Sequence, residues 1–171
     1  WLVQLPEQTV RSALRAVDHL IVCSAYIGRE AEARFPELED RWSTVPNGVD
    51  TGRFFSESRS SHRDLQTVLW VGRISPEKGL HTLLDAFERV SLQCPDATLR
   101  LVGPESPTPR EYLVDISRDP KVRALSEFYQ GSYLATLRAR CRSARVEFTG
   151  PIDHDRLVDE YRRAGILTNP S

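Results

Sequence analysis

Residues 68–79 constrain the fold more than any other stretch, because they place a glycine between two segments of different periodicity. The apolar run 68–71 predicts a buried strand that ends at Gly72. After a polar turn, an amphipathic helix is predicted over residues 76–93, with Ser75 as its N-terminal cap. A strand, a glycine turn and a helix form the unit from which α/β proteins build anion sites, since the turn amides and the positive end of the helix dipole face the same point.

Two cations, Arg73 and Lys78, belong to this turn. The predicted helix puts Lys78 in its first turn, where a basic side chain opposes the dipole. A bound anion removes that conflict, so we expect Gly72, Arg73 and Lys78 to bind a doubly charged group such as a diphosphate. The alternative is that both cations are solvated surface charges, with Glu77 as a partner. Neither the P-loop pattern G-x-x-x-x-G-K-[ST] nor the dinucleotide pattern G-x-G-x-x-G is found here.

Short apolar runs alternate with amphipathic segments along most of the chain. Strands are expected at 20–23, 42–45, 67–71, 98–102, 146–149 and from 166, and helices at 7–18, 25–34, 76–93, 111–118, 122–129, 133–141 and 153–163. This order predicts an α/β fold with a Rossmann-like, doubly wound parallel sheet. Ligands of such sheets bind where the strands end, which selects the turns that begin at Gly72, Gly103 and Gly150.

Several polar residues between these elements have plain structural interpretations. Asn47 and Gly48 predict a turn with positive φ. Asp153 is expected to cap the last helix and Gly165 to end it. His154 lies between two aspartates and resembles an acid–base group, but an exposed position at the start of a helix accounts for it better. We therefore assign no catalytic residue in this chain.

The composition excludes several classes of function. The 171 residues carry 23 basic and 24 acidic side chains, a net charge of −1, so no bulk field favours nucleic acid or a membrane surface. No apolar run approaches the ~20 residues of a transmembrane segment. The three cysteines are isolated, and no His or Cys cluster has metal-ligand spacing. We therefore expect buried free thiols, no metal, and a cytoplasmic location from which the full-length protein could associate peripherally with a membrane.

Five segments follow one another in the order in which one enzyme family carries them. They are a stretch like D-x-[IV]-[IV]-x-x-S at 18–24, P-N-G-V-D at 46–50 followed by Phe54, V-G-R-x-x-x-x-K-G at 71–79, and the strand ends at 101–103 and 146–150. Residues 166–171 are similar to the approach to a further motif. On these segments, which leave out mainly residues 106–144, the chain resembles the retaining GT-B glycosyltransferases of family 4 ("group 1"), chiefly their C-terminal donor-binding domain.

The resemblance implies an enzyme that moves a hexose from a nucleoside diphosphate sugar, of the UDP, GDP or ADP type, to an acceptor with retention and without a metal. It implies that Arg73 and Lys78, with Gly72, bind the donor diphosphate. The wall of the donor pocket and the surroundings of the nucleobase would come from Gly103, Pro104, Gly150, Pro151 and Ile152. The acceptor, whether a sugar, a lipid or a glycan, is not indicated.

The resemblance also divides the chain. Residues 1–46 correspond to the end of an N-terminal acceptor domain, 47–66 to an interdomain turn and polar linker, and 67–171 to a donor domain that is incomplete at its C-terminal end. The family's acidic E-x7-E segment is expected just after Ser171, and residues 106–144 are expected to be an insertion. The chain by itself is then expected to be inactive. A sugar-nucleotide epimerase or a phosphorylase on the same fold, or a non-catalytic nucleotide-binding module, are the alternatives.

Overall fold

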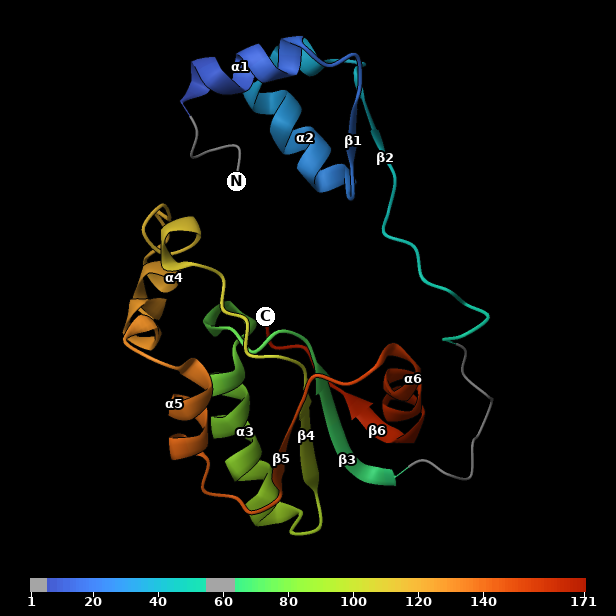
Figure 1. Cartoon of the computed structure of the whole chain (residues 1–171), viewed down its shortest axis with the longest axis vertical. Helices are drawn as coiled ribbons and strands as arrows, with labels where there is room; N and C mark the ends of the chain where they lie inside the picture. The colour runs from blue at the N-terminus through green and yellow to red at the C-terminus, as the bar shows by residue number, and fades with distance from the viewer. Residues whose placement is uncertain (1–5, 55–63) are drawn as a thin grey trace. The chain divides into compact units, whose positions relative to one another are not determined.

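The computed structural model describes residues 6–54 and 64–171, and the chain divides into two compact units, Trp1–Phe54 and Phe55–Ser171. The first unit contains two helices and two short parallel strands (Figure 1). Its elements are α1 (Glu7–Arg15), β1 (Leu20–Val22), α2 (Ala25–Arg34), the 3-10 turn η1 (Pro36–Leu38) and β2 (Trp42–Thr44). The predicted cap of α2 is confirmed, because the Ser24 hydroxyl accepts a hydrogen bond from the Ile27 amide at 3.4 Å.

A small apolar core holds the first unit together. Val10 and Leu14 of α1 pack with Ala31, Phe35 and Leu38. The expected positive-φ turn at residues 47 and 48 is wrong, since the described glycines with positive φ do not include position 48. The chain turns later instead, where the Asp50 carboxylate accepts the amides of residues 52 and 53.

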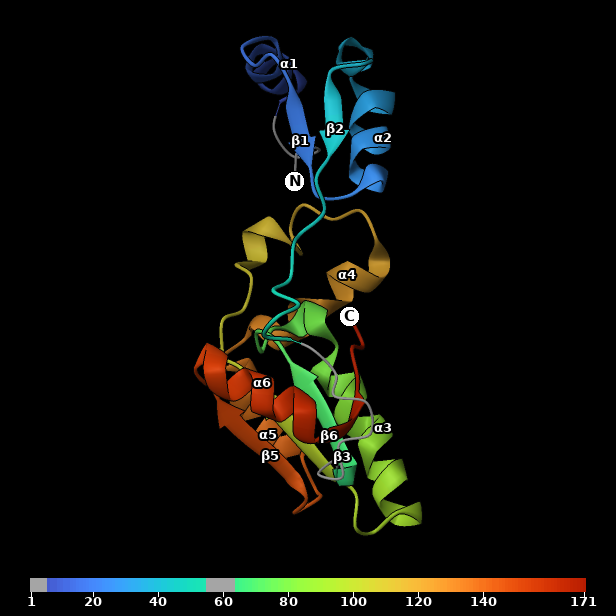
Figure 2. The same cartoon turned by 90° about the vertical axis from the view of Figure 1, so that its right-hand side faces the viewer.

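The second unit is built on a parallel sheet. Among the described residues, the strand order is β5-β4-β3-β6, and all neighbouring pairs are parallel. The strands are β3 (Asp64–Val71), β4 (Thr98–Val102), β5 (Val146–Gly150) and β6 (Ala164–Leu167). Helices α3 (Leu80–Gln93) and α5 (Tyr133–Arg140) cover one face, and α6 (His154–Arg163) covers the other (Figures 1 and 2). The predicted doubly wound parallel α/β sheet is confirmed.

The larger core lies between the sheet and α3 and α5. Alternate residues of the central strands point into it, as period-two burial requires. The fully or almost fully buried members are Trp70, Ile74, Leu80, Leu84, Phe87, Leu99, Leu101, Tyr133 and Leu137. Each large apolar side chain buried in this way contributes about 1.5–3 kcal/mol.

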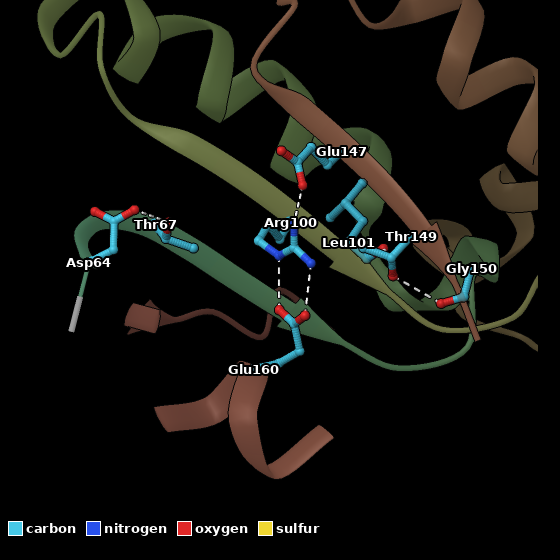
Figure 3. Close-up of polar contacts among 8 residues, drawn as sticks. All are labelled: Asp64, Thr67, Arg100, Leu101, Glu147, Thr149, Gly150 and Glu160. Carbon is cyan, nitrogen blue, oxygen red and sulfur yellow. Dashed lines mark hydrogen bonds and ion pairs between the residues drawn. The ribbon is translucent and has the colours of Figure 1, made fainter. Parts of the chain in front are cut away.

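On the opposite face of the sheet, an ion pair anchors α6. Nε and Nη2 of Arg100 on β4 each donate to a carboxylate oxygen of Glu160 at 2.8 Å, and Glu147 of β5 also contacts Arg100 (Figure 3). The Arg100 side chain is 29% exposed and that of Glu160 is 19% exposed. A bidentate pair with this much burial fixes the orientation of α6 on the sheet.

Strand β6 departs from the prediction at its start. Gly165, expected to end the preceding helix, is part of β6, and α6 already ends at Arg163. A Cβ added at Gly165 would lie 2.6 Å from Cα of Leu65. The glycine therefore permits close approach to β3, which itself begins at Asp64 rather than at the predicted residue 67.

Residues 106–144 differ most from the prediction. The expected helix 111–118 reduces to the 3-10 turn η3 (Arg110–Tyr112). Pro120, which was expected to separate two helices, begins α4 (Pro120–Ala124), and the 3-10 helix η4 (Leu125–Tyr129) follows directly. Proline suits the first helical position because its missing N–H has no partner there anyway.

The cysteines are only partly as expected. They form no disulfide, but Cys23 and Cys94 are exposed, and Cys141 alone of the three is partly buried. The expectation of buried thiols is therefore wrong for the first two. No helix in residues 6–54 or 64–171 is long and apolar enough to span a membrane.

A histidine at the start of α3 makes the stability of the second unit depend on pH. The Tyr133 hydroxyl accepts the backbone N–H of His81 at 3.2 Å and lies 2.8 Å from its Nδ1, and the ring stacks on Phe128 at 4.4 Å. Burial, and secondarily the charge of Arg140, lower the pKa of His81, against smaller opposite effects of Asp85 and Glu127.

Unfolding should therefore become easier as the pH falls from 7 to 5. The unfolded state takes up the His81 proton near pH 6.5, before the folded state does, so stability is lost below that pH. Urea unfolding followed by circular dichroism measures this slope. His81→Gln should flatten the slope, while the exposed His154→Gln should leave it unchanged. Equal slopes for His81→Gln and the unsubstituted chain would contradict the assignment.

Candidate functional site

Three glycines bring the ends of β3, β4 and β5 together. The Gly72 amide donates to the Val102 carbonyl at 2.9 Å, and the Gly103 amide donates to the Gly150 carbonyl at 3.0 Å. A Cβ added at Gly103, where φ is +141°, would lie 1.8 Å from the Gly72 carbonyl oxygen. The turns predicted separately from the sequence therefore form one continuous edge at the carboxyl ends of the strands. Because the Gly72 amide is already bonded, this glycine offers a ligand close approach rather than an N–H group.

The chain after Gly72 runs beside the chain after β4. Ile74 forms a parallel bridge with Glu105, its amide donates to the Pro104 carbonyl at 2.8 Å, and its carbonyl accepts the Ser106 amide at 3.3 Å. Ile74 is buried in the larger core. This pairing prolongs the sheet beyond the regular strands and fixes the start of the loop that carries both predicted cations.

The predicted start of the helix at Pro76 is wrong. Pro76–Lys78 form the 3-10 turn η2, Gly79 takes left-handed φ of 68°, and α3 begins at Leu80. Ser75 has no capping hydrogen bond, because its hydroxyl contacts the Glu77 carboxylate and accepts the Thr108 amide at 3.1 Å. Glycine enters the left-handed region without steric cost, so it separates the 3-10 turn from the α-helix.

Lys78 consequently precedes α3 instead of lying in its first turn, and the dipole conflict inferred from the sequence does not arise there. Its side chain is nonetheless unusual for another reason. The residue is partly buried, and its ammonium group makes no hydrogen bond or ion pair with any residue in 6–54 or 64–171. Partial burial without a partner costs a cation hydration energy, which a bound anion would offset.

Arg73, in contrast, has partners in the loop and in the chain after β4. Nη1 donates to the Ser106 carbonyl at 3.3 Å, and Nη2 lies 3.5 Å from Oγ1 of Thr108 and 3.6 Å from Oε1 of Glu77. The side chain remains 50% exposed. These contacts are long, so each is weak. The alternative of a surface cation partnered by Glu77 thus describes part of the geometry of Arg73, but not that of Lys78.

Glu77 remains charged in this position. Burial by itself would raise its pKa, but hydrogen bonds from the Ser75 and Thr108 hydroxyls, then its own backbone and the charge of Arg73, lower the pKa below the usual range. Thr108 Oγ1 donates to Glu77 Oε1 at 2.7 Å. With Arg73 and Lys78 positive and Glu77 negative, the loop carries one net positive charge at neutral pH.

The chain after β6 lies against the same loop. The Thr168 amide donates to the Leu69 carbonyl at 2.9 Å, and a Cβ added at Gly79 would lie 2.9 Å from the Pro170 carbonyl oxygen. The order β5-β4-β3-β6 reverses direction at β3, since β4 and β5 follow on one side and β6 is added on the other. The loop 72–79 therefore stands at the topological switch point of the sheet, where open α/β sheets bind their ligands.

Comparison with known proteins identifies the family. A family model described as glycosyl transferases group 1 matches residues 66–171. The chain belongs to the group 1 glycosyltransferases. The match contains the sheet of the second unit and all the predicted site residues.

Relatives of this group 1 chain are considerably longer than the chain itself. It is 28% identical over 158 residues to glycogen synthase of Mycobacterium tuberculosis, covering 92% of this chain and 33% of the relative. It is 30% identical over 179 residues to D-inositol 3-phosphate glycosyltransferase 2 of Catenulispora acidiphila, covering 97% of this chain and 39% of the relative. The chain thus spans about a third of the length of these relatives.

Solved structures show the same architecture. An α,α-trehalose-phosphate synthase (UDP-forming) from Burkholderia vietnamiensis superposes with a TM-score of 0.56 and 15% identity, covering 95% of this chain and 42% of that chain. A mutant of S. aureus TarM in complex with fondaparinux, α-GlcNAc-glycerol and UDP gives a TM-score of 0.54 and 12% identity, covering 96% and 27%. The group 1 chain therefore has part of the GT-B fold.

The end of β5 supplies the remaining predicted residues of the group 1 chain. Oγ1 of Thr149 donates to the carbonyls of Leu101 at 3.3 Å and Gly150 at 3.0 Å (Figure 3). Gly150 has φ of +74°, and after it Pro151 is exposed and Ile152 is partly buried. Pro104, at the end of β4, is exposed as well.

The chemistry of this edge depends on cations rather than on acid–base groups. Asp153 makes no side-chain capping hydrogen bond with α6, so that expected cap is wrong, and His154 is exposed at the first position of the helix. The described ranges 6–54 and 64–171 hold no group of three or more His, Cys, Asp or Glu residues that could bind a metal ion. The arrangement is suited to holding an anion by Arg73 and Lys78.

The close contact of Gly103 with Gly72 should make Gly103→Ala strongly destabilising. The new Cβ would clash with backbone, and φ of +141° is strained for any L side chain, so we expect a loss above about 2 kcal/mol. Chemical denaturation measures it. Gly131→Ala is the matched control, because no atom lies within 4 Å of a Cβ at that position. Similar losses for the two variants would disprove the close approach of the strand ends.

Proposed function

We propose that this chain is the donor-binding part of a retaining, metal-independent glycosyltransferase, which transfers a hexose from a nucleoside diphosphate sugar to an acceptor. The observation that carries the proposal is the unpartnered ammonium group of Lys78 within the described chain, beside the half-exposed Arg73, on the loop at the switch point of the sheet. A diphosphate carries the two negative charges that this pair of cations matches.

The contacts of Arg73 are compatible with such a ligand. Its present partners are one carbonyl, one hydroxyl and a carboxylate oxygen at 3.3–3.6 Å. Charge-assisted hydrogen bonds to phosphate are shorter, at about 2.7–2.9 Å, and roughly twice as strong as neutral ones. A diphosphate would therefore compete successfully for this guanidinium. In this proposal the positive charges of Arg73 and Lys78 replace a metal ion at the leaving diphosphate.

Two structural neighbours support a nucleoside diphosphate as the ligand. The TarM complex contains UDP, and a pneumococcal O-GlcNAc transferase, GtfA, was solved with UDP and GlcNAc. For the present chain we propose a donor of the UDP, GDP or ADP type. Its sugar and base would contact Gly103 and Pro104 after β4 and the segment 150–152 after β5.

The division of labour along the chain follows from the same proposal. Residues 1–46 would contribute to an acceptor domain, residues 47–66 would connect the domains, and residues 67–171 would bind the donor. The predicted linker lies partly outside the described residues, because the structure omits 55–63. The acceptor would be a sugar, a lipid or a glycan bound mainly by parts of the longer protein.

Removing either cation should weaken nucleotide binding. Arg73→Ala and Lys78→Ala should each reduce the affinity for the preferred nucleotide by about 1.5–3 kcal/mol, roughly 10- to 100-fold, because each deletes a charged hydrogen bond. Calorimetric titration with UDP, GDP and ADP at one fixed salt concentration measures this and identifies the base. The exposed residues Arg89 and Lys121 provide the controls, and their alanine variants should bind as the unsubstituted chain does.

Two results would refute this assignment. One is the absence of saturable binding to all three nucleotides. The other is equal affinity of the Arg73→Ala and Lys78→Ala variants and the unsubstituted chain. Transfer assays with the chain alone should give no product, since the proposal assigns acceptor binding to other parts of the longer protein.

A further inference from the structure

Thr108 connects the donor loop to the segment that follows β4. Its amide donates to the Ser75 hydroxyl at 3.1 Å, its hydroxyl donates to Glu77 at 2.7 Å, and its carbonyl accepts the hydroxyl of Tyr129 at 2.9 Å. All three polar groups of this residue are therefore used. Two of them bind the loop 72–79, and the third binds η4, within the part of the chain that the sequence left without a function.

The same residue lies next to the cation that is proposed to bind the donor. Oγ1 of Thr108 is 3.5 Å from Nη2 of Arg73, and the Ser106 carbonyl, two residues earlier, accepts from Nη1 at 3.3 Å. Since the Thr108 hydroxyl gives its proton to Glu77, its lone pairs are left to face the guanidinium. The carboxylate is thereby fixed at 3.6 Å from Arg73. The guanidinium is surrounded by acceptors that the segment after β4 supplies or orients.

Exposed arginine side chains lose considerable rotamer entropy when a ligand orders them. Acceptors that hold Arg73 near its bound position before the ligand arrives reduce that cost. The contacts must also be weak enough to exchange for phosphate oxygens, and distances of 3.3–3.6 Å meet that condition. A strong bidentate partner at this site would instead compete with the ligand.

We infer that Thr108 is a positioning residue for Arg73, and that the segment after β4 is a working part of the donor site rather than a neutral insertion. This inference rests on the proposed function, because Arg73 must bind the donor for its orientation to matter. Thr108 acts through Arg73 and Glu77 and need not touch the ligand. Tyr129 supports it from the side opposite to the loop.

The test is a double-mutant cycle between Thr108 and Arg73, measured by titration with the nucleotide that the unsubstituted chain prefers. Thr108→Val keeps the shape but removes the hydroxyl, and it should weaken binding roughly 3- to 10-fold, the equivalent of one neutral hydrogen bond. In the Arg73→Ala background the same substitution should change affinity by less than about twofold, because its effect passes through Arg73. Thr108→Ser should restore binding.

Thr136→Val is the matched control. Its hydroxyl also bonds within the chain, to the Ser132 carbonyl at 3.2 Å, but it lies on α5 away from the loop. Its affinity should equal that of the unsubstituted chain. Should Thr108→Val fail to fold, Tyr129→Phe takes its place, and unchanged affinity in that variant would overturn the inference.

The outcomes separate the two proposals. If Arg73→Ala leaves affinity unchanged, the diphosphate assignment fails. If Arg73→Ala weakens binding but Thr108→Val does not, or weakens it equally in both backgrounds, only the positioning role fails. A measurement without ligand decides independently: ¹⁵N relaxation of the Arg73 Nε–H group should show a side chain that is ordered in the unsubstituted chain and looser in Thr108→Val. Equal mobility in both would overturn the inference.

Discussion

The arrangement of the candidate site depends on the contact between Gly103 and the carbonyl oxygen of Gly72. No side chain fits between these strand ends, since a Cβ would lie 1.8 Å from that oxygen. Their closeness allows Ile74 to pair with Glu105 beyond the regular strands and brings residues 104–108 alongside the loop. The partners of Arg73 and Glu77 come from this second stretch. A backbone constraint at two glycines therefore determines the surroundings of charged side chains several residues away.

Parallel-sheet topology adds the third side of the site. The sheet grows in one direction from β3 through β4 and β5, and β6 is then added on the other side. The chain after β6 consequently meets Gly79, which separates η2 from α3. Helices on both faces support this edge, and α6 is fixed by an ion pair rather than by apolar packing alone. The switch point thus gathers three segments that lie far apart in the sequence.

The sequence predicted the sheet and its strand ends well, because apolar periodicity reports burial and glycines mark where strands stop. It failed where side-chain hydrogen bonds compete with helix formation. Ser75 looked like a cap, yet its hydroxyl serves Glu77 and the Thr108 amide, and α3 starts only after Gly79. The role of Thr108 gave no local signal, since its partners are more than twenty residues away in both directions. The residues of the site were predictable, but not the pairing that orients them.

Two arginines of the second unit show how contact geometry separates structure from binding. Arg100 is 29% exposed and grips Glu160 through two contacts of 2.8 Å. Arg73 is 50% exposed, and its contacts measure 3.3–3.6 Å. Breaking the first pair would strand a partly buried carboxylate, which is costly. Releasing the second leaves Glu77 with the hydroxyls of Ser75 and Thr108, so its charge remains satisfied. Arg73 can therefore turn to an incoming anion at little cost, and this property suits it to binding rather than to holding the fold.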